Sequence, residues 1–595
     1  MAADLPLALS INFAKKSKTI SLTLFNRPEP TVAAIPLELQ FQYDPTTPYA
    51  PIHEKVDDRN QRIKQHYWNL WNLDATATKG MAALNIADEF EGESVTITED
   101  EIEQFCRVVG IEGEAYKKNF KGGMQVPMDF AIKLGWKSIM KPIFPNAIDG
   151  DLLKLVHLSN GFRVLPGAPT LLPGDLVSST SRIESVTNSD SGKTVSVKGT
   201  VFLESRAGDK GKAAQAKVAV LEVSSSFLYR GKFTDYAQTF SRIESPTYAV
   251  DVATPEILAV LQSKEWFQWD NDEAPLAQGT TLHFKTESHY VYADKSSYSK
   301  VDVTGGAYII TREQKLEIKV ATIEYSSEGE GVTKGDPVVE YLKRHGKPLE
   351  QPALFESGGY ALNTEGQCTF RTPATNDDYS KTSGDTNPIH TNPYFAALAA
   401  LPGTITHGMH SSARTRRFVE QVAAANVGSR VSKYSVGFTA MCLPDHAMEV
   451  RLRHIGMTTT GNKLIKVDTI DLDSDSAVVL TGTAEIAQAP TAYVFTGQGS
   501  QEPGMGMELY NNSAVARAVW DQADEHLGEV YGFSILEIVR TNPKEKTVHF
   551  GGLKGQATRQ KYVSSIFTFN FGSACDSSSP PRDQQLTRNS LARWR

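Results

Sequence analysis

Residues 127–144 read PMDFAIKLGWKSIMKPIF, and this stretch, with the four runs that follow it, decides the fold. Phe130, Leu134, Trp136 and Ile139 lie at helical spacing and proline marks both ends, so one long buried helix is predicted. Runs rich in Val, Leu, Ser and Thr then follow, divided by Gly, Asp, Asn and Pro. They cover roughly 152–165, 175–188, 193–205 and 217–231. We therefore expect a helix followed by an antiparallel meander.

The same order recurs further along the chain. A second helix is predicted from about His407 to Ala425, and strand-like runs follow near 430–442, 447–458, 463–473 and 477–488. In both copies a proline turn precedes a turn lysine, Lys193 or Lys463, by about twenty residues. This recurrence indicates an internal repeat of one supersecondary unit.

The repeat predicts an α+β fold built from several modules. A sheet must bury its apolar face, and one long helix lying across it achieves this within about a hundred residues. Two copies, 110–245 and 346–488, would pair their sheets into a larger one. Residues 246–345 supply further strand-like runs but no convincing long helix, so we interpret them as a degenerate middle module.

Composition and charge exclude several classes of protein. The formal net charge of −8 is spread along the chain without a basic stripe, which argues against nucleic-acid binding. No apolar run approaches the length of a membrane span, and no basic segment precedes the first apolar residues. The four cysteines are far apart, so neither a disulfide framework nor a zinc site is indicated: Cys106, Cys368, Cys442 and Cys575. A cytoplasmic protein is expected.

Two short segments of the second copy hold the densest run of unusual residues, SGDTNPIH at 383–390 and LPGTITHGM at 401–409. Pro388 fixes its own φ and biases Asn387 away from the helical region. The first segment should therefore be a stiff loop that points Asp385 and His390 into one cleft. The imidazole of His390 is suited to proton exchange near neutral pH. Taken alone, Asp385 would also suit an Asx-type turn.

Together these segments resemble the signature of MaoC-like hot-dog hydratases and dehydratases, in which an Asp and a His five residues apart act on a thioester. The resemblance implies repeated hot-dog modules, with 346–488 catalytic and 110–245 a non-catalytic partner. His390 would then abstract the α-proton, and Asp385 would protonate or hold the departing hydroxyl. The backbone N–H of Gly408, at a helix start, would stabilise the thioester oxyanion.

The same resemblance implies supporting roles for neighbouring residues. The expected substrate-binding residues are Asn387, Pro388, Gly403, Thr404 and His407. His407 should also support the helix start by hydrogen bonding, and Thr404 or Thr406 could cap that helix. We interpret His157 and His410 as scaffold histidines.

A second resemblance begins at residue 492 with AYVFTGQGSQ. This stretch is similar to the opening strand and oxyanion loop of malonyl/palmitoyl acyltransferases, in which the glutamine matching Gln498 flanks the acyl oxyanion. Such an enzyme also needs a G-x-S-x-G nucleophile elbow, and none follows in this sequence. We therefore interpret 492–566 as a truncated acyltransferase without catalysis, and Ser500 as a loop residue.

The order of these segments resembles the β chain of fungal fatty acid synthases. That family implies that 1–109 connects a reductase to the dehydratase, and that the chain is a fragment or a split gene product. Residues 567–595 are rich in Ser, Pro, Gln and Arg, and disorder is expected there.

The resemblance implies a dehydratase that converts a (3R)-3-hydroxyacyl chain to the trans-2-enoyl thioester. The substrate would be carried on the phosphopantetheine of an acyl carrier protein, without a metal or a diffusible cofactor. Expected partners are the carrier protein and the synthase α chain, in an oligomer when assembled. Two alternatives stay open: a stand-alone hydratase of coenzyme A thioesters, and a non-catalytic truncated fragment.

Overall fold

The computed structural model divides into two compact units, 1–489 and 490–595. Within the 595 residues, the structure describes 9–26, 35–73, 79–206, 216–270, 275–311, 316–329, 335–489 and 502–543. Gln498, Ser500 and the tail 567–595 lie outside the described residues. None of the described helices is long and apolar enough to cross a membrane.

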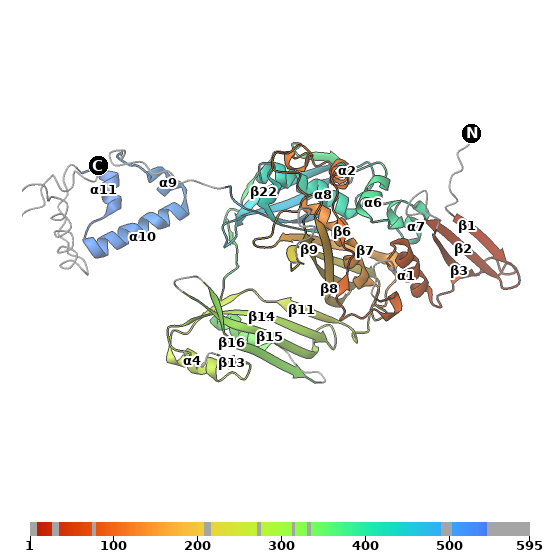
Figure 1. Ribbon diagram of the computed structural model, residues 1–595, viewed down its shortest axis with the longest axis horizontal. Helices are drawn as coiled ribbons and strands as arrows, with labels where there is room; N and C mark the ends of the chain where they lie inside the picture. Colours follow the sequence, from red (N-terminus) through yellow and green to blue (C-terminus); the bar gives the residue numbers. More distant parts are fainter. Residues whose placement is uncertain are drawn as a thin grey trace, which may run out of the picture. The chain divides into compact units, whose positions relative to one another are not determined.

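The first copy of the repeat has the predicted order of a helix and a meander (Figure 1). A 3-10 turn (Met128–Phe130), helix α3 (Ala131–Met140) and a second 3-10 turn (Lys141–Ile143) follow one another along the predicted helix. The strands after them are β7 (Leu155–Val164), β8 (Leu176–Ser189), β9 (Gly192–Ser205) and β10 (Val218–Arg230). They pair antiparallel in the order β8-β9-β10-β7, and α3 packs on β8, β9 and β10.

The second copy repeats this arrangement. Helix α8 (Gly408–Phe418) continues into a π-helical turn (Val419–Ala423). The strands are β21 (Val431–Phe438), β22 (Ala447–Met457), β23 (Lys463–Asp471) and β24 (Ala477–Ile486), in the order β22-β23-β24-β21. Short strands β18 (Ala353–Leu354), β19 (Tyr360–Ala361) and β20 (Thr369–Arg371) pair with β22.

The two half-sheets join edge to edge, because β21 pairs antiparallel with β7 and places Tyr434 opposite Phe162. β7 and β21 are thereby each flanked by a strand on both sides, so neither presents an open edge. The paired hot-dog architecture expected from the repeat is confirmed.

The segment between the copies forms a sheet with its own apolar core, which includes Val250, Phe284 and Ile323. Its strands are β11 (Phe240–Glu244), β12 (Tyr248–Asp251), β13 (Phe267–Trp269), β14 (Thr281–Tyr292), β15 (Tyr298–Ile310), β16 (Glu317–Glu328) and β17 (Lys347–Pro348). Helices α4 (Pro255–Gln262) and α5 (Pro337–His345) are short. This agrees with the absence of a long helical pattern in that part of the sequence.

The N-terminal part contributes a small sheet and two helices. Strands β1 (Leu9–Ala14), β2 (Thr19–Asn26), β3 (Ile35–Gln42) and β4 (His53–Glu54) pair in sequence order, and α1 (Arg59–Leu70) packs on β3. β5 (Phe90–Glu91) and β6 (Val95–Thr96) pair with β8. Helix α2 (Glu99–Val109) contacts α8 and α6 (Asp377–Ser383).

The second unit shows three helices among its described residues: α9 (Met507–Asn512), α10 (Ala514–Tyr531) and α11 (Ile535–Thr541).

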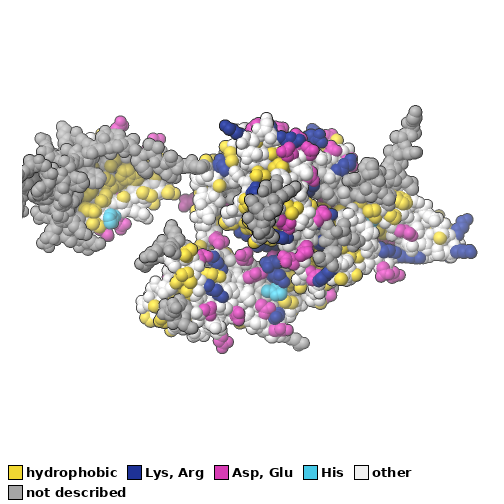
Figure 2. Space-filling view, viewed as in Figure 1, with side chains coloured by type: hydrophobic (Ala, Val, Ile, Leu, Met, Phe, Trp, Pro, Cys, Tyr) yellow, Lys and Arg dark blue, Asp and Glu magenta, His cyan; other side chains and the backbone are white. Residues whose placement is uncertain are grey.

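Lys, Arg, Asp and Glu side chains are interspersed over the face of the protein seen in Figure 2, in agreement with the spread of charge along the sequence.

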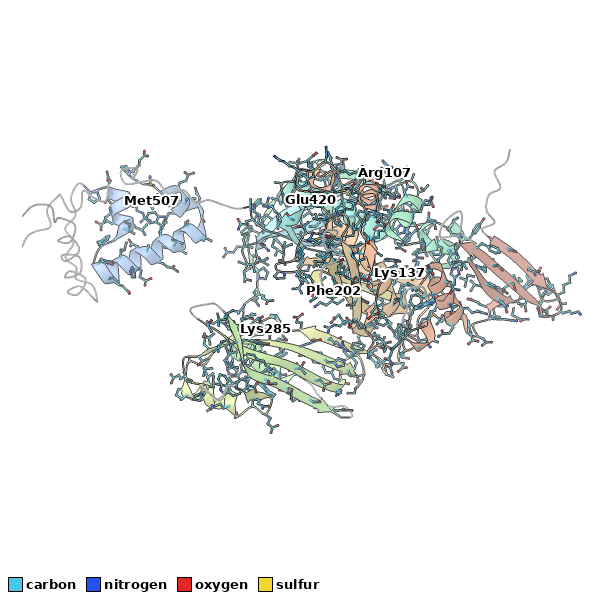
Figure 3. All side chains as sticks on the ribbon, viewed as in Figure 1. Arg107, Lys137, Phe202, Lys285, Glu420 and Met507 are labelled. Carbon is cyan, nitrogen blue, oxygen red and sulfur yellow. The ribbon has the colours of Figure 1, made fainter. Side chains whose placement is uncertain are left out.

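A buried ionic group connects the two long helices. Arg416 of α8 is 0% exposed and forms ion pairs with Asp129, at the start of the first helix, and with Glu420, at 2.8 Å. The hydroxyl of Tyr116 donates to the same Glu420 oxygen at 2.9 Å; Figure 3 labels Glu420. Because these pairs join the two helices directly, α3 and α8 lie on the same side of the joined sheet.

Replacing Arg416 with Met should destabilise the main unit by about 3–5 kcal/mol, because two buried carboxylates would lose their only cationic partner among the described residues. Urea unfolding followed by tryptophan fluorescence measures the change.

The neighbouring Arg417 is the matched control. It pairs with Glu112 at 3.0 Å, and the Glu112 side chain is 77% exposed. The Arg417→Met variant should lose less than about 1 kcal/mol. Equal losses in the two variants would contradict a structural role for the buried group.

Candidate active site

The loop that carries Asp385 and His390 lies between α6 and α7 (Pro393–Leu398). Helix α6 ends at Gly384, whose φ of 82° is a left-handed conformation that glycine adopts without strain. Asn387 has φ −57° and ψ 118°, outside the helical region as predicted for a residue before proline. Its side-chain oxygen accepts the Ile389 N–H at 3.3 Å and caps the 3-10 turn η8 (Pro388–His390). This turn brings His390 back toward Asp385.

The imidazole of His390 is held as a neutral base. Its Nδ1 lies 2.7 Å from the carbonyl oxygen of Ile405. A carbonyl can only accept, so Nδ1 carries the proton and Nε2 has the free lone pair. Asn376 donates to the carbonyls of both His390 and Ile405, at 2.9 and 3.0 Å. Burial lowers the pKa of His390 to about 4, so the ring is uncharged near neutral pH.

Burial acts in the opposite direction on Asp385. Its pKa rises to about 7, although the Asn387 N–H, 3.2 Å from Oδ1, favours the charged form. The side chain keeps 16% exposure. Its main-chain carbonyl accepts from Ser380 Oγ at 2.7 Å and from His407 Nε2 at 3.0 Å. Asp385 can therefore supply a proton at a pH where His390 can accept one.

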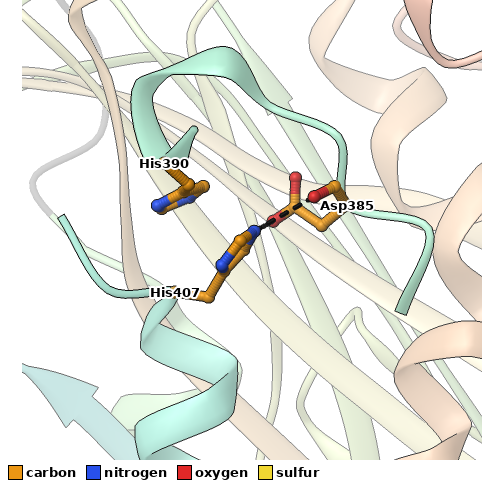
Figure 4. A group of neighbouring side chains, drawn as sticks. All are labelled: Asp385, His390 and His407. Carbon is orange, nitrogen blue, oxygen red and sulfur yellow. Dashed lines mark hydrogen bonds and ion pairs between the residues drawn. The ribbon is translucent and has the colours of Figure 1, made fainter. Parts of the chain in front are cut away.

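His407 packs directly against this pair (Figure 4). Its ring is 1% exposed and stacks on the ring of His390, with centroids 3.7 Å apart and an interplanar angle of 26°. The side-chain ligand atoms of Asp385, His390 and His407 lie within 4.8 Å of one another. However, near-parallel stacked rings do not aim their lone pairs at one point, and one nitrogen of each ring already donates to a carbonyl. The group suits proton transfer better than metal binding.

Gly408 begins α8, with His407 at the N-cap position and no side-chain cap. The expectation that Thr404 or Thr406 caps this helix is wrong. His407 takes the N-cap position, and Thr406, whose N–H donates to the carbonyl of Cys442 at 2.8 Å, precedes it in the chain. Among the described residues no acceptor is found for the Gly408 N–H. An uncapped helix N-terminus of this kind can stabilise an oxyanion.

The Phe438 ring explains why glycine is needed at this position. A Cβ built on Gly408 would lie 3.1 Å from that ring, so a side chain would crowd β21. The ring of His157 of β7 stacks on that of Phe227, with centroids 4.8 Å apart, and lies tilted against that of Phe438, with centroids 5.2 Å apart, which agrees with a scaffold role.

The other expected substrate-binding residues differ in their surroundings. Pro388 is buried at the first position of η8. Nothing lies within 4 Å of a Cβ built on Gly403, and Thr404 is half-buried. The Asn387 oxygen is already occupied, since it also accepts the hydroxyl of Tyr67 at 3.2 Å.

Three residues that hold the loop were missed by sequence reasoning: Tyr67, Asn376 and Ser380. Asn376 and Ser380 lie close to the motif and could have been considered as turn and helix-start residues. No local sequence pattern points to Tyr67, because it lies 320 residues from its hydrogen-bond partner Asn387.

Five family models match the chain in sequence order. Their descriptions are a fatty acid synthase meander β-sheet domain (residues 3–74), a FAS1-like dehydratase domain region (85–210) and a fatty acid synthase subunit β insertion domain (240–342). A MaoC-like domain (359–475) and an acyl transferase domain (492–569) follow. The MaoC-like match contains Asp385, His390 and Gly408.

Curated relatives match nearly the whole chain. The fatty acid synthase subunit β of Schizosaccharomyces pombe is 45% identical over 94% of this chain, and that of Saccharomyces cerevisiae 44% over 90%. The chain spans 26% and 25% of their lengths, respectively. A solved MaoC-like dehydratase covers 69% of this chain and 100% of its own, at 12% identity and a TM-score of 0.39.

The raised pKa of Asp385 predicts that this carboxyl costs stability when it ionises. A folded-state pKa above the unfolded value favours the protonated protein, so this contribution is lost as pH rises from about 4 to about 7. Asp385→Asn should therefore be more stable than the unmodified chain at pH 8, by at most about 4 kcal/mol, and nearly equal to it at pH 4. Urea unfolding at both pH values measures the difference.

Asp378→Asn provides the control, because Asp378 is exposed on the neighbouring helix α6. It should show no comparable gain at pH 8. A gain in Asp385→Asn that is the same at pH 4 and pH 8 would show that ionisation is not its cause.

Proposed function

We propose that the chain is a 3-hydroxyacyl thioester dehydratase. It corresponds to the segment of fungal fatty acid synthase β subunits that runs from the meander sheet, through the dehydratase region, to the start of the acyltransferase domain. The observation that carries the proposal is the pairing of Asp385, with a raised pKa, and neutral His390 beside an uncapped helix start. Burial has prepared an acid and a base in one site.

Elimination of water needs both groups at once. His390 Nε2 accepts the α-proton of the 3-hydroxyacyl thioester, and the resulting negative charge on the thioester oxygen is stabilised by the Gly408 N–H. The bond between C3 and its hydroxyl breaks as Asp385 donates a proton, so the hydroxyl leaves as water. The proton on His390 then returns to Asp385 through solvent. Hydration of the enoyl thioester is the reverse of these steps.

The substrate we propose is a (3R)-3-hydroxyacyl chain on the phosphopantetheine of an acyl carrier protein, converted to the trans-2-enoyl thioester. The chemistry above uses only side chains and one backbone N–H, so the proposal needs no metal or diffusible cofactor. The carrier protein and the synthase α chain are the proposed partners, in the cytoplasm. We propose no acyl transfer by residues 492–566, because no G-x-S-x-G sequence occurs among them.

Hydration of crotonyl thioesters tests the function and the roles together. Asp385→Asn and His390→Ala should each lower turnover by about 10²–10⁴-fold, the usual contribution of a general acid or base. Loss of enoyl absorbance is followed with crotonyl carrier protein and crotonyl coenzyme A in parallel.

Asp378→Asn is again the matched control and should keep full activity. Faster turnover of the carrier-protein substrate is expected, whereas a preference for coenzyme A would favour a stand-alone hydratase. Near-normal activity in either site variant would remove the proposed acid and base, and inertness of the unmodified chain would favour a non-catalytic fragment.

The pH dependence of kcat/KM should be bell-shaped. Dehydration needs neutral His390, so the rate falls as pH drops through about 4. It also needs protonated Asp385, so the rate falls as pH rises through about 7. Hydration starts from the state in which His390 carries the proton and Asp385 is ionised. This state holds the same number of protons as the state used in dehydration, so the rate of hydration should fall at the same two pH values. A rate that keeps rising well above pH 7 would contradict a protonated Asp385.

A further inference from the structure

The N-terminal part of the chain is anchored to the first hot-dog module by a buried lysine. Lys64 of α1 is 1% exposed, and its Nζ donates to the carbonyls of Phe144, Pro145 and Ile148 at 3.2, 3.1 and 2.8 Å. These carbonyls follow the end of the first long helix, where main-chain acceptors attract a cation. The position of α1 along that module is therefore set by three hydrogen bonds.

Tyr67 lies one turn further along the same face of α1. Its side chain is 1% exposed, and its hydroxyl donates to the Asn387 side-chain oxygen at 3.2 Å. Burial, with the nearby charges of Asp151 and Asp385, raises the pKa of Tyr67 far above its usual value. The hydroxyl therefore stays a neutral donor across the working pH range.

Asn387 is the residue through which this contact reaches the acid and the base. Its backbone N–H donates to the Asp385 carboxylate at 3.2 Å, and its side-chain oxygen caps the turn that carries His390. The same oxygen is the acceptor for Tyr67. A shift of the Asn387 side chain would thus move His390 relative to Asp385.

A second contact holds the other end of this loop. Asn392 donates to the Asn26 side-chain oxygen at 3.2 Å, and Asn26 in turn contacts His66 Nε2 at 3.2 Å. The His66 ring stacks on Phe395 with centroids 5.6 Å apart. The loop 387–392 is therefore held at both ends by side chains from residues 9–73.

We propose that Tyr67 is a positioning residue of the dehydratase site, acting through Asn387, and that residues 9–73 are a working part of this site rather than a connecting segment. The inference rests on the proposed function for its catalytic meaning. The bracing of the loop can be tested without activity.

The variant Tyr67→Phe in the full chain removes one hydroxyl and leaves the ring in place. Tyr229→Phe is the matched control, because Tyr229 is also fully buried and donates one hydrogen bond, to the Ile143 carbonyl at 2.8 Å. For crotonyl thioester hydration, Tyr67→Phe should lower kcat by about threefold to tenfold, the size of one hydrogen bond. KM should change by less than about twofold, and Tyr229→Phe should keep kcat.

A double-mutant cycle with Asn387→Ala tests whether Tyr67 acts through Asn387. If it does, Tyr67→Phe should cause no further loss of kcat in the Asn387→Ala background. Losses that multiply would overturn the proposed route, as would equal losses of kcat in Tyr67→Phe and Tyr229→Phe.

Hydrogen exchange followed by mass spectrometry gives a readout that does not depend on turnover. Peptides covering 385–392 should exchange about threefold to tenfold faster in Tyr67→Phe and unchanged in Tyr229→Phe, because the amides of Asn387, Ile389 and His390 bond within this loop. Unchanged exchange in Tyr67→Phe would overturn the inference even if the unmodified chain were active. Faster exchange in an inactive chain would support the bracing and count against the proposed function.

Discussion

The antiparallel pairing of β7 with β21 is the constraint on which the rest of the main unit depends. Each half-sheet has an edge strand, β7 or β21, that would otherwise face solvent, and the pairing covers both edges with backbone hydrogen bonds. It also places the two long helices side by side on the joined sheet, where Arg416 meets Asp129 inside the protein. A buried arginine between two carboxylates tolerates little displacement, so the helices keep a fixed separation.

The acid–base chemistry of the site follows from burial, because this packing excludes water from the site. Removing water disfavours whichever form of a group is charged, so the same burial raises the pKa of Asp385 and lowers that of His390. The ordinary order of the two pKa values is thereby reversed, so between about pH 4 and pH 7 the carboxyl holds the proton while the imidazole is neutral. No opposing charge of a third residue is needed, because backbone groups supply the hydrogen bonds that orient both side chains.

The segment before the first hot-dog module extends this arrangement. Lys64 of α1 donates to carbonyls that follow the end of the first long helix, and the next turn of α1 places Tyr67 against Asn387 in the loop of Asp385. If a buried donor and acceptor separate, both are left without a hydrogen-bond partner, which costs free energy. Such a contact therefore fixes the position of the loop more closely than apolar packing alone. The loop of Asp385 is thus held by residues from three parts of the chain.

The sequence by itself determined the features that depend on local patterns. Helical spacing in 127–144, the period of the strands and the recurrence of both predicted the repeated helix and meander, and Pro388 predicted the non-helical backbone of Asn387. The site was indicated by the resemblance of the Asp and His motif to a known family, and one stiff loop carries both residues. Only the tertiary structure decided the rest. The start of α8 has no threonine cap because His407 occupies the N-cap position, and the reversed pKa order arises from burial. Arg416 and Tyr67 bond to partners 287 and 320 residues away. Such contacts depend on which surfaces meet after folding, and no local pattern of residues encodes that meeting.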